Sequence, residues 1–163
     1  MTLEIRLLAD ADWSGLWPII EAVTREGETY TYPLDMAEAA ARVLWTPAPP
    51  GGTLIAVEDG CILGAAKIVP NQQGNGAHVA NGSFMVSPEA RGRGVARRLG
   101  EAALDFARAA GFRSMQFNAV VETNAHAVAL WRSLGFEVVG TVPEAFDHPR
   151  HGLVGLHVMY RRL

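Results

Sequence analysis

Residues 91–97, a run rich in arginine and glycine, combine the residue types that bind an anion through backbone groups. Gly92 and Gly94 carry no side chains, so N–H groups could come close to a ligand where the chain enters a helix. Free N–H groups and the helix dipole favour an anion at such a point, and Arg91 and Arg93 add positive charge. The run therefore predicts a site for a phosphate-bearing ligand, although a helix capped by a glycine-rich turn with two surface arginines would look the same.

The spacing within this run excludes two common phosphate-binding motifs. No GxxxxGK[ST] sequence occurs, so a P-loop is excluded. The dinucleotide fingerprint needs glycine or alanine where Arg97 stands, and it places its first glycine directly after a strand, whereas residues 87–90 intervene here. The pattern that fits is R-x-x-G-x-[GA], formed by Arg91, Gly94 and Ala96.

A long helix must follow the run and position it. Apolar residues recur at helical spacing from Val95 through Leu99, Ala103 and Phe106 to Ala110, so this stripe is expected to face a core. Gly111 follows, where a helix commonly ends.

The rest of the chain alternates apolar runs with turn signals. A hairpin is expected at Asp59-Gly60, and Asn81-Gly82 predicts a bulge or a splay in its strand. Pro18 lies inside the first predicted helix, where a proline removes a backbone hydrogen bond and tends to kink or break the helix. A second helix from Asp35 is expected to turn Ala39, Ala40 and Val43 inward. We predict strands over 3–8, 53–57, 61–69, 78–86, 114–121, 137–141 and 153–161. Helices are predicted from Asp10 or Asp12 to residue 23, over 35–45, from the glycine-rich run that begins at residue 91 to residue 110, and over 124–134.

A second motif lies at residues 123–136, TNAHAVALWRSLGF. It is similar to the N-x-x-A-x-x-L-Y-x-x-x-G-F segment of the Gcn5-related N-acetyltransferases (GNAT), and the first motif resembles the coenzyme A pyrophosphate loop of that family. The matching residues of the second motif are Asn124, Ala127, Leu130, Gly135 and Phe136. The resemblance implies an α/β (α+β) fold whose mixed, mostly antiparallel sheet is splayed between strands 4 and 5, with helices on both faces. We expect one domain over residues 1–163.

This resemblance implies acetyl-CoA as co-substrate. Met85 and Val86 would pair with the pantetheine arm through their backbone groups, and Asn124 would reach the same arm while also capping its helix. Trp131 stands where the family has a tyrosine that acts as general acid; indole cannot supply that proton, so we assign Trp131 to the cofactor wall and no general acid. The pyrophosphate would lie on Arg91, Gly92, Arg93, Gly94, Val95, Ala96 and Arg97.

Two asparagines are candidates for catalysis and for binding the acceptor. Asn81 and Asn118 would lie beside the cleft where the strands part, although each could instead be a core asparagine. The stretches 70–86 and 115–124 also resemble the yeast acetyltransferase that acts on the proline analogue azetidine-2-carboxylate, whose matching asparagines line the acceptor and pantetheine sites. Tyr30 is a further candidate for the acceptor site, which loops 28–32 and 146–151 would wall. The base stays open among His78, Glu122, His126 and Glu28.

Composition narrows the partners. A net charge of −3 disfavours nucleic acid, Cys61 is a lone cysteine, and no apolar run approaches the length of a membrane span. The sequence has no recognisable leader, so we expect a cytoplasmic protein. The expected partner is a small-molecule amine acceptor, and we expect the protein to bind no metal, no nucleic acid and no membrane. A homodimer is compatible with the sequence. A protein acetyltransferase acting on lysines or N-termini, and a CoA-binding module without turnover, remain alternatives.

Overall fold

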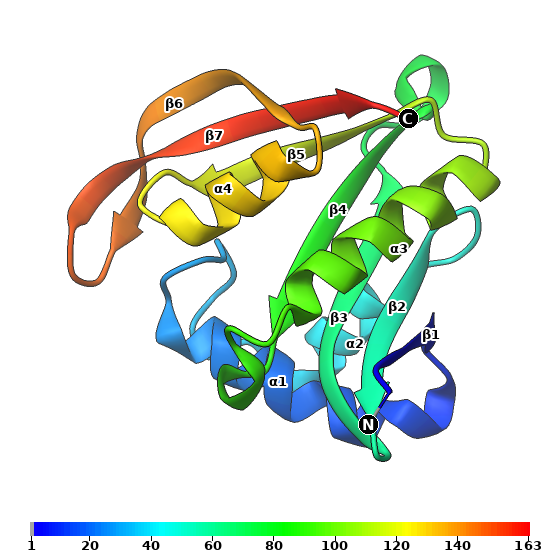
Figure 1. Cartoon of the computed structure of the whole chain (residues 1–163). Coiled ribbons are helices and arrows are strands. Elements are labelled where there is room, and N and C mark those ends of the chain that lie inside the picture. Colours follow the sequence, from blue (N-terminus) through cyan, green and yellow to red (C-terminus); the bar gives the residue numbers. More distant parts are fainter. Residues whose placement is uncertain (1) are drawn as a thin grey trace.

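A mixed sheet of seven strands forms the centre of the protein in a computed structural model that describes residues 2–163 (Figure 1). The strand order is β1-β2-β3-β4-β5-β7-β6. Within the described residues, β4 and β5 are the one parallel pair of neighbours. The strands are β1 (Glu4–Leu7), β2 (Gly52–Glu58), β3 (Cys61–Pro70), β4 (Val79–Val86), β5 (Ser114–Val121), β6 (Glu137–His148) and β7 (Gly152–Arg162).

Helices cover both faces of this sheet, as expected. The α3 and α4 helices share a core with Leu54 and Ile68 on one face, whereas α1 and α2 pack against Ile55 and Ala65 on the other. Figure 1 shows α3 crossing in front of β2, β3 and β4, with α2 behind them. The helices are α1 (Trp13–Glu26), α2 (Glu38–Trp45), α3 (Val95–Ala109) and α4 (Ala125–Ser133), so the predicted order of elements is confirmed.

The sheet splits between β4 and β5. These strands pair only over residues 79–81 and 114–116, after which β4 follows β3 and β5 follows β7. The separation is visible in Figure 1, where the two strands diverge away from the C-terminus. The β3–β4 register continues unshifted through Asn81 and Gly82, so the predicted splay is confirmed and the alternative of a bulge is wrong.

The prediction of which face of α2 is buried is wrong. Val43 is 76% exposed and Ala39 and Ala40 are exposed, whereas Ala41 and Trp45 are buried. The helix begins at Glu38 rather than Asp35, and burial of the large Trp45 ring sets its rotation, because residue 41 lies on the same side four positions earlier while residue 43 lies opposite.

The last hairpin is longer than its sequence suggested. Residues 146–148, expected in a loop, extend β6 and pair with residues 152–154 of β7. Pro143 obscured this strand, because it falls in an irregular segment between Val142 and Phe146 where the register shifts and Glu144 has a φ of 51°.

Two helix boundaries also differ from expectation. The α1 helix runs through Pro18 to Glu26, and the carbonyl that loses its bond to Pro18 belongs to Ser14, an exposed residue of the first turn, so water can satisfy it. The α3 helix ends one residue earlier than predicted, and Ala110 is exposed rather than part of the buried stripe.

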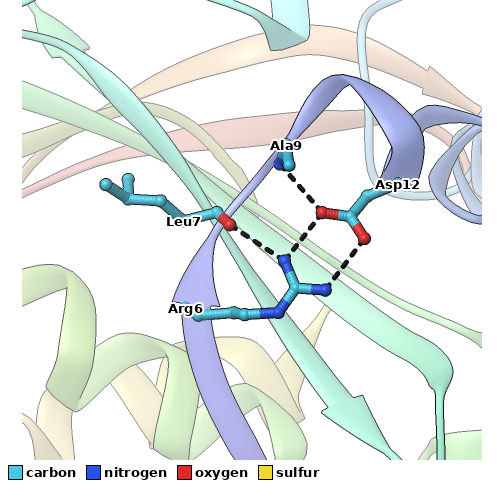
Figure 2. Close-up of polar contacts among 4 residues, drawn as sticks. All are labelled: Arg6, Leu7, Ala9 and Asp12. Carbon is cyan, nitrogen blue, oxygen red and sulfur yellow. Dashed lines mark hydrogen bonds and ion pairs between the residues drawn. The ribbon is translucent and has the colours of Figure 1, made fainter.

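A network of polar contacts joins β1 to the turn before α1 (Figure 2). The Arg6 guanidinium donates to both carboxylate oxygens of Asp12, at 2.7 and 2.9 Å, and the N–H of Ala9 donates to the same carboxylate at 2.8 Å. These bonds, chiefly those from Arg6, lower the pKa of Asp12 from 3.8 to about 2. The network therefore favours the folded state only while the carboxylate is ionised.

Replacing Asp12 with asparagine should lower Tm by about 3 °C near neutral pH, because the ion pair with Arg6 is lost. Since the pKa of Asp12 is lower in the folded state, its contribution is complete above about pH 4 and disappears as the pH falls towards about 2. Thermal melts of both proteins across this range measure the difference. Asp10→Asn is the control, because the Asp10 side chain is 98% exposed; an equal loss of Tm in both variants would contradict the assignment.

Candidate active site

A cleft of about 350 Å³ opens where β4 and β5 separate. It receives side chains from both strands, from α4, from β3, from α2 and from the loop that follows α1. Its lining residues include Tyr30, Tyr32, Leu44, Lys67, Asn81, Gly82, Ser83, Phe84, Phe117, Asn118, Asn124, Ala127 and Trp131.

Strand alternation divides the cleft into two sides. Met85 of β4 belongs to the α1/α2 core, so Asn81 and Ser83, four and two residues earlier, point to that same face. Phe84 packs instead with the α3/α4 core. The cleft therefore passes through the split in the sheet, from an apolar side below α4 to a polar side next to α1 and α2.

Aromatic rings build the apolar side. Trp131 of α4 is 7% exposed and its ring centroid lies 4.5 Å from that of Phe84 and 4.8 Å from that of Phe117. The rings of Phe117 and Phe136 stack at 4.3 Å. Trp131 is thus held as a wall of the cleft, and an indole N–H has no proton to give up near neutral pH.

Asn124 occupies the expected position at the start of α4. Its Oδ1 accepts a hydrogen bond from the N–H of Ala127 at 3.3 Å, so it caps the helix as predicted, and it also lines the cleft. The amide nitrogen of Asn124 makes no side-chain hydrogen bond within residues 2–163. That nitrogen remains available to a ligand, and contact with the pantetheine arm stays a prediction.

The arginine- and glycine-rich run has the backbone that its sequence predicts. Gly92 and Gly94 both have a φ of 77°, a conformation that favours glycine. No side chain of the described chain caps α3, so the N–H groups of Val95, Ala96 and Arg97 in its first turn have no acceptor there. The turn therefore presents free donors and the positive end of the helix dipole.

The arginines of this run make side-chain contacts with other elements of the fold. Arg91 forms an ion pair with Glu26 at 2.6 Å, and Arg93 pairs with Glu58 of β2. Arg97 donates to the hydroxyl of Ser133 on α4 at 2.8 Å. The positive charges of Arg91 and Arg93 are therefore compensated by carboxylates. The free backbone N–H groups are the main feature of the turn that could bind an anion.

Tyr30 lies against β4 on the polar side. Its hydroxyl donates to the backbone oxygen of Phe84 at 2.7 Å, and its ring stacks on Tyr32 at 5.0 Å. Burial raises the pKa of Tyr30 well above its ordinary value, so the hydroxyl stays protonated and remains a donor. Tyr30 thus holds its loop against the strand that edges the cleft.

Asn118 and Asn81 share this polar side. Asn118 is exposed, donates to Oδ1 of Asn71 at 2.7 Å and accepts from the amide of Gln116 at 2.9 Å, so the alternative of a core asparagine is wrong for it. Asn81 is half-buried, pairs in register with Gln116, and makes no side-chain hydrogen bond to any residue from 2 to 163. Both amides can contact a ligand in the cleft.

None of the four candidate bases is among the residues from 2 to 163 that line this cleft. The four are His78, Glu122, His126 and Glu28. Glu122 accepts from the N–H of Gly155 at 2.6 Å, and Glu28 pairs with Arg150 at 2.9 Å. The Glu28–Arg150 pair joins the tyrosine loop to the turn between β6 and β7, so the two expected walls are in contact. Residues 146–151 themselves do not line the cleft.

Sequence reasoning missed Lys67 of β3. It is 9% exposed, lines the cleft, and its ammonium lies 5.4 Å from the ring centroid of Trp45. Burial lowers the pKa of this lysine. The sequence contained a signal for this residue, because Lys67 is the one charged residue in the apolar run 61–69.

Comparison with known proteins agrees with this geometry. The sequence model of the acetyltransferase (GNAT) family matches residues 17–136. The chain belongs to the GNAT acetyltransferase family. N-acetyltransferase aca1 of Schizosaccharomyces pombe is 40% identical over 100 residues, which cover 61% of this chain but only 48% of aca1. The matched region thus spans about half the length of that curated relative.

Solved GNAT structures share the whole fold. A GCN5-related N-acetyltransferase from Kribbella flavida is 54% identical, with a TM-score of 0.95 over 99% of this chain and 98% of that one. The ribosomal-protein-alanine N-acetyltransferase of Brucella melitensis is 26% identical, with a TM-score of 0.87 over 99% of this chain and 100% of that one. The split sheet and the cleft therefore belong to an acetyltransferase fold.

Two structural observations complete the description of this GNAT chain. Within residues 2–163, no three side chains of histidine, cysteine, aspartate or glutamate gather as a metal site would require. None of the helices described there is long and apolar enough to cross a membrane.

Proposed function

We propose that this GNAT protein transfers the acetyl group of acetyl-CoA to the amine of a small molecule, with an amino acid or an amino-acid analogue as the candidate acceptor. The observation that carries the proposal is the cleft through the split sheet. Features suited to the co-substrate lie on its α3/α4 side, and small uncharged hydrogen-bonding groups lie on its α1/α2 side.

The residues present fit acetyl-CoA. The uncapped first turn of α3, with Gly92 and Gly94 before it, suits a pyrophosphate. Beyond Asn81, β4 has no partner strand on its β5 side, so backbone groups near Met85 and Val86 can pair with an extended arm. Acetyl-CoA would supply the acetyl group already activated as a thioester.

The chain's own contribution would be chiefly to bind and orient. The amides of Asn81 and Asn118 can each donate and accept a hydrogen bond, so they can hold an amine or a carboxylate without changing its charge. An α-amine with a pKa of about 8 is partly neutral at physiological pH, so a strong base is not required. Trp131 cannot act as general acid, and we assign that role to no side chain.

A protein acceptor is the second candidate, since the Brucella relative is named for acetylating an alanine of a ribosomal protein. The ion pair between Glu28 and Arg150 favours the small acceptor, because it ties the loop lining the cleft to the β6–β7 turn and so limits the room for a polypeptide. A CoA-binding module without turnover is the third candidate, favoured by the tryptophan at the tyrosine position.

A turnover screen tests the proposal. Release of free thiol from acetyl-CoA should be measured with amino acids, polyamines and peptides as acceptors, and we expect turnover with amino acids. Turnover with peptides alone would favour the protein acceptor. Binding of acetyl-CoA by calorimetry, without turnover of any acceptor, would favour the binding module.

Asn118→Ala should lower kcat/KM for the amine about tenfold, because an oriented hydrogen bond is lost, while the KM for acetyl-CoA stays within about twofold. Asn124→Ala is the matched comparison and should instead raise the KM for acetyl-CoA. Because Asn118 is exposed, its removal should leave Tm nearly unchanged. Equal effects of Asn118→Ala on both substrates, with a lowered Tm, would return this residue to a structural role.

A further inference from the structure

Lys67 is the one charged side chain among the residues that line the cleft, within the part of the chain that the structure describes. It is 9% exposed and forms no hydrogen bond or ion pair with any residue from 2 to 163. A buried ammonium without a counter-ion is costly, since its lost hydration is not replaced. The ring of Trp45 compensates part of this cost through a cation–π contact at 5.4 Å.

The neighbours of Lys67 place it on the acceptor side. It lies opposite Ser83 in the β3–β4 register, and Asn81 is the next residue on the same face of β4. Directly opposite residues of an antiparallel pair have Cβ atoms about 5 Å apart, and diagonal ones about 7 Å, so a long lysine side chain and a short amide can meet at one ligand group. The groups facing this point are an ammonium, a hydroxyl and an amide.

This combination selects the charge of the acceptor. No aspartate or glutamate lines the cleft within residues 2–163, so nothing there would compensate a second cation such as a polyamine or a lysine side chain. An anionic oxygen would provide the missing counter-ion of Lys67, and it would also accept from the neutral donors beside it.

We propose that Lys67 binds the carboxylate of the acceptor and makes this enzyme selective for amines that carry a carboxylate. The inference rests on the proposed function, in which the acceptor occupies this side of the cleft. It deepens that function by naming the group that the pocket recognises besides the amine, and it predicts discrimination between an amino acid and its uncharged amide.

Lys67→Met tests the proposal, because methionine keeps an unbranched apolar stem against Trp45 and removes the charge. The acceptors are the amino acid with the highest turnover in the screen and the amide of that same amino acid. For the amino acid, kcat/KM should fall at least about thirtyfold in the variant, the size of a lost charge-assisted hydrogen bond, while kcat/KM for the amide should change less than about threefold. The KM for acetyl-CoA should be unchanged. Equal losses for both acceptors would overturn the inference and leave the proposed function standing.

A binding measurement separates this inference from the proposed function. Affinity of the CoA-loaded protein for the amino acid should be measured by calorimetry in the parent and in Lys67→Met, together with Tm to confirm folding. Binding of the amino acid that is lost in Lys67→Met, without turnover in either protein, would uphold the inference and contradict the proposed function. Absence of a difference in affinity between the amino acid and its amide in the parent protein would overturn the inference. Arg113→Met, which removes a charge outside the cleft, is the control and should preserve the preference.

Discussion

Gly94→Asp should weaken acetyl-CoA binding at least a hundredfold, equivalent to about 3 kcal/mol of binding free energy. Gly94 directly precedes the uncapped first turn of α3, where N–H groups are free. An aspartate there would place a negative charge at the proposed pyrophosphate site and would offer its own oxygen to the same N–H groups. Calorimetric titration of acetyl-CoA into each protein measures the loss.

The backbone of Gly94 requires a matched control. Its φ of 77° disfavours any residue with a side chain, although a Cβ at this position would meet nothing within 4 Å in the described chain. Gly94→Asn imposes the same strain with a neutral side chain of the same size, and asparagine tolerates this conformation better than most residues. We expect the asparagine variant to lose at most about tenfold in affinity. Equal losses in both variants would mean that strain, rather than charge, causes the effect, and the anion site would be rejected.

Gly82→Val should lower kcat/KM at least about a hundredfold, because it fills the point where β4 leaves β5. A Cβ on Gly82 would lie 2.9 Å from the ring of Phe84 and 3.0 Å from the ring of Phe117, so both rings must move. These rings pack against Trp131 and line the cleft, and the displacement would therefore narrow the passage through the split sheet. Steady-state kinetics with both substrates measures the effect.

Overpacking by valine would also lower the free energy of unfolding, by about 1–3 kcal/mol, so folding has to be checked by Tm. Gly140→Val is the matched control, because Gly140 lies in β6 and a Cβ there would meet nothing within 4 Å in the described part of the chain. We expect this control to keep kcat/KM within about threefold. A folded Gly82→Val protein with undiminished activity would show that the acetyl group does not pass through the split at this point.

Local chemistry explains what could be predicted from the sequence. The turn before α3 depends on Gly92 and Gly94, whose backbone conformation only a few residue types accept, so the residues themselves report the structure. Asn124 bonds to the N–H of Ala127 within the same turn, and the interaction is visible in the sequence as a capping residue followed by a helix. The splay was indicated by Asn81-Gly82 inside an apolar strand.

Contacts between segments that are distant in the chain could not be predicted from the sequence. The rotation of α2 depends on where Trp45 finds a cavity in the core, which propensity does not specify. The candidate bases illustrate the same limit, because Glu28 and Glu122 carry suitable groups but are engaged by Arg150 and by the backbone of Gly155. Residue type indicates what chemistry a side chain can do, and its neighbours decide whether that chemistry is available.

The family, the order of the elements and the glycine turn before α3 could be predicted from the sequence, because each is specified by residues close together in the chain. The surroundings of the proposed acceptor site depend instead on the assembled fold. Lys67 is an isolated charge in a strand, and it becomes a candidate binding group because β3, β4 and α2 together bury it beside Asn81 and over Trp45. Burial and missing counter-ions are properties of the assembled fold, and they determine whether a charged side chain is solvated or directed at a ligand.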